Sequence, residues 1–437
     1  MTTGTLHFVN ALLPLIDETG LYEMKASGGR WISIRKQTKT PMSDDNLTSI
    51  VRLGIELREP AYAGTIDLEG RVMLPGFVDA HMHLDKAFSL AKVPNESGTL
   101  LEAIKNYGAA VPDFTKSEIK ERIRKAALMA LSNGTTKIRS HLDLNLSFGK
   151  EVAFRTLEAA LEAREELSGL IEIQLFPICP YHHLTVHDRE VVEEVLRSGV
   201  DGVGGAPHLS ETPVEDIHWL FQLAERYDMP IDLHTDESDN PSRRTVLDIA
   251  AKTIDYGFQG RVTVDHLCSL AAMKEEDAAV AIQRMADSKL NAVTLPAVNL
   301  YLQGREDLGL IRRGTTRIRE LLRAGIQLAT ASDNIQDPFH PFGKADLLQI
   351  ASITAYAAHM GSPEDLRTLL RMVTEIPASI MGLSEFGIQE GNPCQFVILD
   401  ARTVEECFTL MPESRWVYTN QNWPCVTYIY RKMPDNA

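Results

Sequence analysis

The chain has 437 residues, of which 44% are hydrophobic and 24% are charged, so it has enough apolar material for a large folded core. Its formal net charge of −16 argues against a nucleic-acid backbone or an anionic membrane surface as partner. The five cysteines are scattered and form no Cys-x-x-Cys pair, which is typical of a reduced cytoplasmic protein rather than a disulfide framework or a zinc ribbon.

The first segment, up to about residue 67, predicts short strands and turns. Residues 6–9 and 31–34 are rich in β-branched and aromatic side chains, and the glycine pair 28–29 indicates a turn between strands. The apolar residues 8–16 have no basic segment before them, so they predict a first strand rather than a signal peptide. No run is long enough to span a bilayer.

A histidine pair ends the next apolar stretch, residues 72–85. His81 and His83 are spaced i, i+2, and in an extended strand such residues point to the same face. Two imidazoles that converge on one point are what a divalent metal ion needs. The alternative is an ordinary pair of histidines. The apolar strand pattern before the pair, and the His and Asp residues at later strand ends, favour a metal site.

From Leu74 onward, apolar strand patterns alternate with amphipathic helical patterns. Further strands are predicted at residues 136–141, 170–177, 202–205, 230–234, 261–266, 291–295 and 326–333. Helices are predicted at residues 117–133, 151–168, 191–198, 214–227, 245–256, 276–289 and 316–324. Counted from His81, these make eight strand–helix units, which predict an α/β fold with a (β/α)8 TIM-like barrel.

The end of the chain returns to β-rich composition after a helical stretch that reaches Met381. Strands are predicted at residues 395–400 and 426–430. We expect them to pair with the first strands of the chain in a small β-sandwich. The predicted domains are therefore residues 1–70 with 382–437 for the sandwich, and residues 71–381 for the barrel.

Polar side chains directly follow five of the eight apolar barrel strands, at the end where barrels of this class carry their chemistry. These side chains are His81, His83, His141, His234, His266 and Asp333. The metal ligands expected among them are His81, His83, His234 and Asp333. This set leaves one coordination position open, as a catalytic site requires, and Asp333 can also accept a proton from water.

Glu237 and His266 are the expected catalytic partners of Asp333. Glu237 lies three residues beyond His234, where it can reach the site without being a ligand, and this suits a proton shuttle; the alternative is a solvated loop carboxylate. His266 can orient the attacking water or polarise the substrate, unless it is a packed strand-end histidine. The stretch His141-Leu142-Asp143 helps to line the pocket or is purely structural, and the residues alone do not decide.

Other polar residues near the motifs are expected to have minor roles. Asp85 and Lys86 are each expected either to support the site or to be solvated, and solvation is the favoured interpretation for Lys86. Asp236 is interpreted as a surface or loop carboxylate and Asp337 as structural. The cluster of His182, His183 and His187 is interpreted as part of a loop, residues 181–188, that follows the third strand.

Several motifs resemble the amidohydrolase superfamily of metal-dependent hydrolases, and within it bacterial cytosine deaminase. The matching stretches are residues 75–85, 234–237, 298–305, 312–317 and 332–339, and the similarity extends over nearly the whole chain. The resemblance implies one divalent metal ion, Zn²⁺ or Fe²⁺. It further implies proton transfer by Glu237, His266 near the attacking hydroxide, release of ammonia from a small heterocyclic substrate, and a homo-oligomer in the cytoplasm.

Two departures from that family concern the substrate. Cytosine deaminases place a glutamine after the third strand to read the pyrimidine edge, but here Ile178 and Tyr181 lie in that region; Asn334 stands where an aspartate is expected. A site that is specific for one base recognises it through hydrogen bonds from such polar groups. We therefore expect deamination of a cytosine-like or related amino-heterocycle, with Ile178, Tyr181, Asn334 and His141 as substrate-binding residues. The alternatives are hydrolysis of a ring amide, hydrolysis of a substituted exocyclic amine, or a non-catalytic barrel protein.

Overall fold

A parallel sheet of eight strands forms the centre of the molecule. The computed structural model describes residues 5–38, 50–52, 64–179, 184–309 and 312–429. The eight strands lie in chain order, each parallel to the next. They are β7 (Phe77–Met82), β8 (Thr135–Asp143), β9 (Glu172–Cys179), β10 (Val203–Gly205), β11 (Ile231–Thr235), β12 (Val262–His266), β13 (Asn291–Thr294) and β14 (Leu328–Thr330).

A single bridge joins the last strand of this sheet back to the first. Met82 at the end of β7 pairs in parallel with Asp333, three residues beyond β14, and the Asp333 backbone N–H donates to the His81 carbonyl at 2.9 Å. The sheet thereby closes into a barrel at the level of His81 and Asp333. The predicted TIM-like fold class is confirmed.

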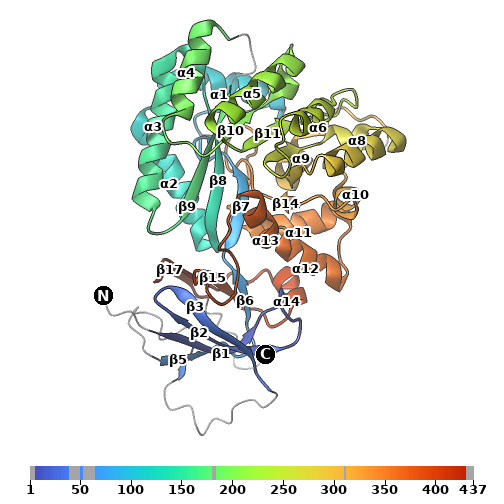
Figure 1. The fold of residues 1–437 in the computed structure, drawn as a ribbon. Helices are drawn as coiled ribbons and strands as arrows, with labels where there is room; N and C mark the ends of the chain where they lie inside the picture. The colour runs from blue at the N-terminus through green and yellow to red at the C-terminus, as the bar shows by residue number, and fades with distance from the viewer. Residues whose placement is uncertain (1–4, 39–49, 53–63, 180–183, 310–311, 430–437) are drawn as a thin grey trace.

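Helices surround the barrel (Figure 1). They are α1 (Leu100–Ala110), α2 (Lys116–Ser132), α3 (Lys150–Leu167), α4 (Val186–Leu196), α5 (Pro213–Tyr227), α6 (Thr245–Asp255), α7 (Ser269–Ala272), α8 (Glu275–Asp287), α9 (Pro296–Leu302), α10 (Ile318–Arg323), α11 (Leu347–Ala358), α12 (Pro363–Arg371) and α13 (Glu375–Ile380). None of the helices in these ranges is long and apolar enough to cross a membrane.

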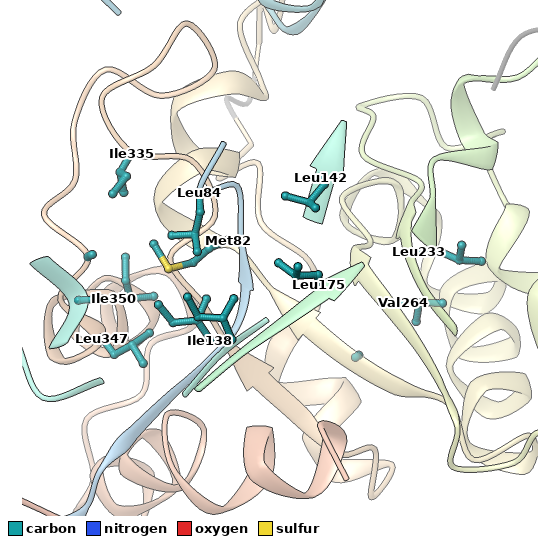
Figure 2. Close-up of a cluster of buried hydrophobic side chains, with 14 of the residues drawn as sticks. Met82, Leu84, Ile138, Leu142, Leu175, Leu233, Val264, Ile335, Leu347 and Ile350 are labelled. Atoms are coloured by element: carbon teal, nitrogen blue, oxygen red, sulfur yellow. The ribbon is translucent and has the colours of Figure 1, made fainter. Parts of the chain in front are cut away.

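Alternation along the strands decides which side chains face the barrel interior. Met82, Leu142, Leu233 and Val264 belong to one buried apolar cluster (Figure 2). Each of them lies next to a polar residue of the strand end, and neighbouring side chains of a strand point to opposite faces. Burial of the apolar set against the helices therefore turns the His and Asp side chains inward.

The two ends of the chain form a second sheet of nine strands. Its strands are β1 (Leu6–Leu12), β2 (Leu21–Ser27), β3 (Arg30–Lys36), β4 (Ile50–Arg52), β5 (Gly64–Asp67), β6 (Val72–Pro75), β15 (Phe396–Leu399), β16 (Arg415–Thr419) and β17 (Asn422–Thr427). β6 pairs with both β1 and β15, so it joins the N-terminal and C-terminal strands before the chain enters the barrel at β7. The proposed boundaries at residues 70 and 382 stay predictions.

A buried ion pair connects the second sheet to the barrel. The Arg415 guanidinium on β16 donates to both carboxylate oxygens of Asp346, at 2.7 and 2.9 Å, and to the carbonyl of Asn133. Asp346 also accepts from the Leu348 N–H and thereby caps α11. One arginine therefore holds the start of α11 and the end of α2 against the sheet of the termini.

The structure corrects several boundaries predicted from the sequence. α4 begins at Val186, so the loop expected over residues 181–188 is wrong for residues 186–188. The last strand is β17 at Asn422–Thr427, which leaves residues 428 and 429 outside any strand. Strand β16 and the helices α1, α9 and α14 (Val404–Thr409) were not predicted from the sequence. β16, α9 and α14 have seven residues or fewer and are too short to show a clear hydrophobic period.

Candidate active site

Four side chains meet where the barrel closes. His81 and His83 come from the end of β7, His234 from β11, and Asp333 from the segment after β14. Their ligand atoms lie close together: His83 Nε2 is 3.1 Å from His234 Nε2, and Asp333 Oδ1 is 3.5 Å from His81 Nε2 and 3.4 Å from His83 Nε2. All four side chains are buried.

The donor set fits a divalent metal ion. Ligands at about 2.0–2.1 Å from a tetrahedral ion lie about 3.4 Å from one another, close to the separations seen here. His81 Nε2 and both carboxylate oxygens of Asp333 are buried without a hydrogen-bond partner among the described residues. Burial lowers the pKa of His83 and of His234 well below the ordinary value, so both imidazoles are neutral, whereas the pKa of His81, which burial alone would lower, is raised by the carboxylates of Asp265 and Asp333. A neutral pair facing each other at 3.1 Å requires a shared proton or cation.

A second layer of polar groups orients these ligands. Asp265 Oδ2 accepts from His81 Nδ1 at 2.9 Å, which leaves His81 Nε2 free to face the other ligands. The His208 Nδ1 donates to the carbonyl of His234 at 3.0 Å. Neither Asp265 nor His208 was predicted from the sequence to belong to the site. Asp265 could have been predicted, because it lies inside the apolar run of β12 and a charge is buried in such a strand only together with a partner.

The backbone is left-handed where the chain leaves the strands. His266, Asp333 and Asp236 have φ of 64°, 60° and 51°. Residues other than glycine rarely adopt this conformation, and such strain gathers at functional sites. Here it turns the chain away from the strand directly beside the ligand cluster.

Glu237 lies on the wall of the cavity above the ligands, with its Oε1 3.5 Å from His266 Nδ1. Burial, with a smaller contribution from the Asp333 carboxylate, raises the pKa of Glu237 to about 8. A carboxyl group of this kind carries a proton near neutral pH and can donate it. Because the Glu237 side chain is buried and its pKa is raised, it does not fit the alternative of a solvated loop carboxylate.

His266 is held as a neutral imidazole. Burial lowers the pKa of His266 to about 3. The Asn299 side-chain amide donates to His266 Nδ1 at 3.0 Å, so the ring proton lies on Nε2, which is buried and has no partner among the described residues. His266 therefore presents an N–H donor. Asn299 is a further residue whose role the sequence analysis did not identify.

A cavity of about 460 Å³ opens from the ligand cluster toward α1 and the short helix η3 (Leu146–Phe148). Its inner wall contains His83, His234, Glu237, His266 and Asp333. Its outer wall is largely apolar and includes Leu100, Ile104 and Phe148. The cavity has room for a heterocycle that extends beyond one ring.

The residues expected to bind substrate have different positions. Ile178 and Asn334 line the cavity, and the Asn334 amide donates to Asp337 at 2.7 Å. His141 is fully buried behind the ligands, with its ring centroid 4.2 Å from that of His81, and it is not among the lining residues. Its role in substrate binding stays a prediction. Tyr181 lies outside the described residues, as do His182 and His183.

Two polar residues expected at the surface or in solvent are buried. Asp236 lies in the loop after β11, as one half of its interpretation had it, but it is fully buried and accepts from the Thr245 N–H, the Thr245 hydroxyl and the Val246 N–H, so the surface half was wrong. Lys86 is also buried and forms an ion pair with Asp143 at 3.0 Å, so the solvated interpretation was wrong there too. Asp85 is buried beside them. Asp337 accepts from the backbone of Phe339 and His340, which is a structural contact.

Comparison with known proteins agrees with this geometry. The family model described as the amidohydrolase family matches residues 64–144 and 127–419. A pterin deaminase of Rhizobium rhizogenes is 31% identical over 86% of this chain and 84% of its own length. An N-isopropylammelide isopropyl amidohydrolase of Pseudomonas sp. is 32% identical over 77% of this chain and 81% of its own length.

A solved structure shares the complete fold. The 5-methylcytosine deaminase of Klebsiella pneumoniae, liganded with 5-fluorocytosine, aligns with a TM-score of 0.88 at 27% identity. The alignment covers 99% of this chain and 100% of the other. The barrel and the sheet of the termini are therefore common to both proteins.

Proposed function

The chain belongs to the amidohydrolase family and is a hydrolase of C–N bonds, and from this premise we propose that it is a metal-dependent deaminase of an amino-heterocycle. The proposed reaction replaces the amino group of a cytosine-like or related ring with an oxo group and releases ammonia. The observation that carries the proposal is the buried Glu237 carboxyl, which lines the same cavity as a His and Asp set that fits one divalent ion.

The proposed metal ligands are His81, His83, His234 and Asp333, with Zn²⁺ or Fe²⁺ as the ion. When bound, the ion supplies a Lewis acid that makes water a nucleophile near neutral pH. In this proposal an Asp333 oxygen takes a proton from the attacking water. The His266 Nε2–H donates to the oxygen that attacks and so fixes its direction toward the ring carbon.

Glu237 is the proposed proton shuttle. In its protonated form it donates to the ring nitrogen next to the carbon under attack, which makes that carbon more electrophilic. The Glu237 carboxylate then takes the remaining proton of the attacking oxygen, which becomes the oxo group, and passes it to the amino group, which leaves as ammonia. The proton held by Asp333 returns Glu237 to its acid form. Deaminase relatives of this chain, for pterin and for 5-methylcytosine, support a ring of this class as substrate.

Replacement of Glu237 tests the assignment. The Glu237→Gln variant has nearly the same shape but cannot exchange a proton, so we expect it to keep its metal and lose about 10²–10⁴-fold in turnover. Metal content and ammonia release are measured on the same samples. The exposed Glu276→Gln on α8 is the matched control and should behave as the parent. Near-normal turnover of Glu237→Gln would remove Glu237 from the mechanism.

A second candidate is hydrolysis of a substituted exocyclic amine. It is favoured by the 32% identity to the N-isopropylammelide enzyme and by the apolar outer wall of the cavity, where Leu100, Ile104 and Phe148 could accommodate an alkyl group. The amine product separates the two candidates, because this reaction yields an alkylamine instead of ammonia.

A further inference from the structure

The wall of the cavity next to the ligands contains a charged pair that the proposed mechanism does not use. Lys86 lies three residues beyond His83, and its backbone N–H donates to the His83 carbonyl at 3.2 Å. Asp143 is the last residue of β8. The Lys86 ammonium lies 3.0 Å from Asp143 Oδ1, and both residues line the cavity.

Packing holds the ammonium in place. Lys86 Nζ lies 4.7 Å from the centroid of the Phe339 ring and 5.8 Å from that of Tyr107, two further residues of the cavity wall. Burial alone would lower the pKa of Lys86, but the carboxylates of Asp143 and Asp85 raise it above the ordinary value. The amine is therefore a fixed, charged donor. It also lies near enough to act electrostatically on Glu237 and Asp333.

The pair offers a donor and an acceptor side by side, with little net charge. An ammonium has three N–H groups and a carboxylate has several acceptor positions, so each keeps capacity after the two have paired. A lone buried lysine would favour an anionic ligand. A paired lysine and aspartate instead complement a neutral group that has an acceptor and a donor next to each other.

Resting on the proposed function, we propose that Lys86 and Asp143 recognise the lactam edge of the substrate ring, the adjacent C=O and N–H. Lys86 Nζ donates to the lactam oxygen, and an Asp143 carboxylate oxygen accepts from the lactam N–H. The substrate class is thereby narrowed to amino-heterocycles that carry a ring lactam. The glutamine expected after the third strand is absent from this chain. In this proposal Lys86 and Asp143 supply the polar contacts to the ring in its place.

Matched probes test this inference. Isocytosine and 2-aminopyrimidine share one ring and one amino group but differ in the lactam, and pterin and 2-aminopteridine form the corresponding bicyclic pair. We expect kcat/KM for ammonia release to favour the lactam member by at least about 10²-fold, since a buried polar site rejects a ligand that leaves it unpaired. In Lys86→Met and in Asp143→Ala, which removes the acceptor, that preference should fall below about tenfold, mainly through loss on the lactam member.

Controls separate recognition from support of the fold. Lys105→Met removes another cavity lysine, an exposed one on α1, and should leave the preference unchanged. Asp143→Ala shortens a partly exposed side chain, so it tests the idea even if Lys86→Met does not fold. Equal losses on both members of a probe pair would show that the pair only supports the structure and would overturn the inference, as would a parent enzyme without the preference.

Binding distinguishes this inference from the proposed function. Calorimetry on metal-loaded Glu237→Gln protein gives dissociation constants for the same probes without turnover. If no probe releases ammonia but the lactam members still bind at least tenfold more tightly, and Lys86→Met abolishes that difference, the deaminase assignment fails and the recognition of the lactam stands. If ammonia is released without any lactam preference in rate or in binding, the deaminase assignment stands and the recognition of the lactam fails.

Discussion

His81 shows how much of the site depends on single hydrogen bonds. Its Nδ1 donates to Asp265, which directs its Nε2 toward Asp333 and the other histidines. Sequence reasoning picked out the four expected ligands because each follows an apolar strand, and the structure places their side chains together. Asp265 was missed, because its contact with His81 joins β12 and β7, two strands that do not pair, and so depends on the closed barrel and not on any local pattern.

Removal of the Asp265 carboxylate should loosen the metal site. Because the carboxylate fixes the tautomer and orientation of His81, we expect Asp265→Asn to bind Zn²⁺ about 10–100-fold more weakly, as measured by competition with a chelator. Asp287→Asn makes the same chemical change at an exposed position on α8 and serves as the control. Unchanged affinity in Asp265→Asn would mean that His81 is oriented by packing alone.

At the scale of elements, the active-site strands and their following helices are joined through polar residues. Asp236 leaves β11 in a left-handed conformation, and its carboxylate accepts three hydrogen bonds at the start of α6. α6 has no cap from its own preceding residue, Arg244. The sequence shows an aspartate between His234 and Glu237. It does not show that Thr245, nine positions later, donates hydrogen bonds to that carboxylate.

This remote cap makes a stability prediction. In Asp236→Ala the N–H groups of Thr245 and Val246 lose their buried acceptor, so we expect the free energy of unfolding in urea to fall by about 1–3 kcal/mol. Asp236→Asn keeps one oxygen and should lose less. A loss in Asp236→Ala no larger than a few tenths of a kcal/mol would show that water replaces the carboxylate.

At the scale of the whole molecule, the barrel could be predicted because eight strand–helix units repeat along the chain. The pairing of the two chain ends was predicted in outline, whereas the link between that sheet and the barrel was not. The link is the buried Arg415–Asp346 pair, which joins residues 69 positions apart that no periodicity relates. The homo-oligomer inferred from the family resemblance stays a prediction.

The Arg415–Asp346 pair predicts an acid-sensitive contribution to stability. Burial alone would raise the pKa of Asp346, but Arg415 lowers it below its ordinary value of about 3.9. A carboxylate with a lowered pKa in the folded state stabilises the fold above about pH 3.9, and this contribution is lost as the pH falls through the folded-state pKa. We expect the free energy of unfolding of the parent to exceed that of Asp346→Asn by about 3–5 kcal/mol at pH 7. This difference should shrink below about pH 4.

Urea unfolding at a series of pH values measures this difference. The exposed Asp255→Asn on α6 is the control and should track the parent at each pH. A difference between parent and Asp346→Asn that stays constant from pH 7 to pH 3 would contradict the ionic origin of the link.

The most direct test of the deaminase assignment is the identity of the amine that the metal-loaded protein releases. Protein with one equivalent of Zn²⁺ or Fe²⁺ is incubated with amino-pyrimidines, purines, pterins, amino-triazines and their N-alkyl analogues, and ammonia, alkylamine and oxo product are quantified together. The proposal predicts ammonia and the oxo-heterocycle in equal amounts from at least one amino-heterocycle. Protein that holds its metal but releases only an alkylamine, or no amine at all, would contradict it.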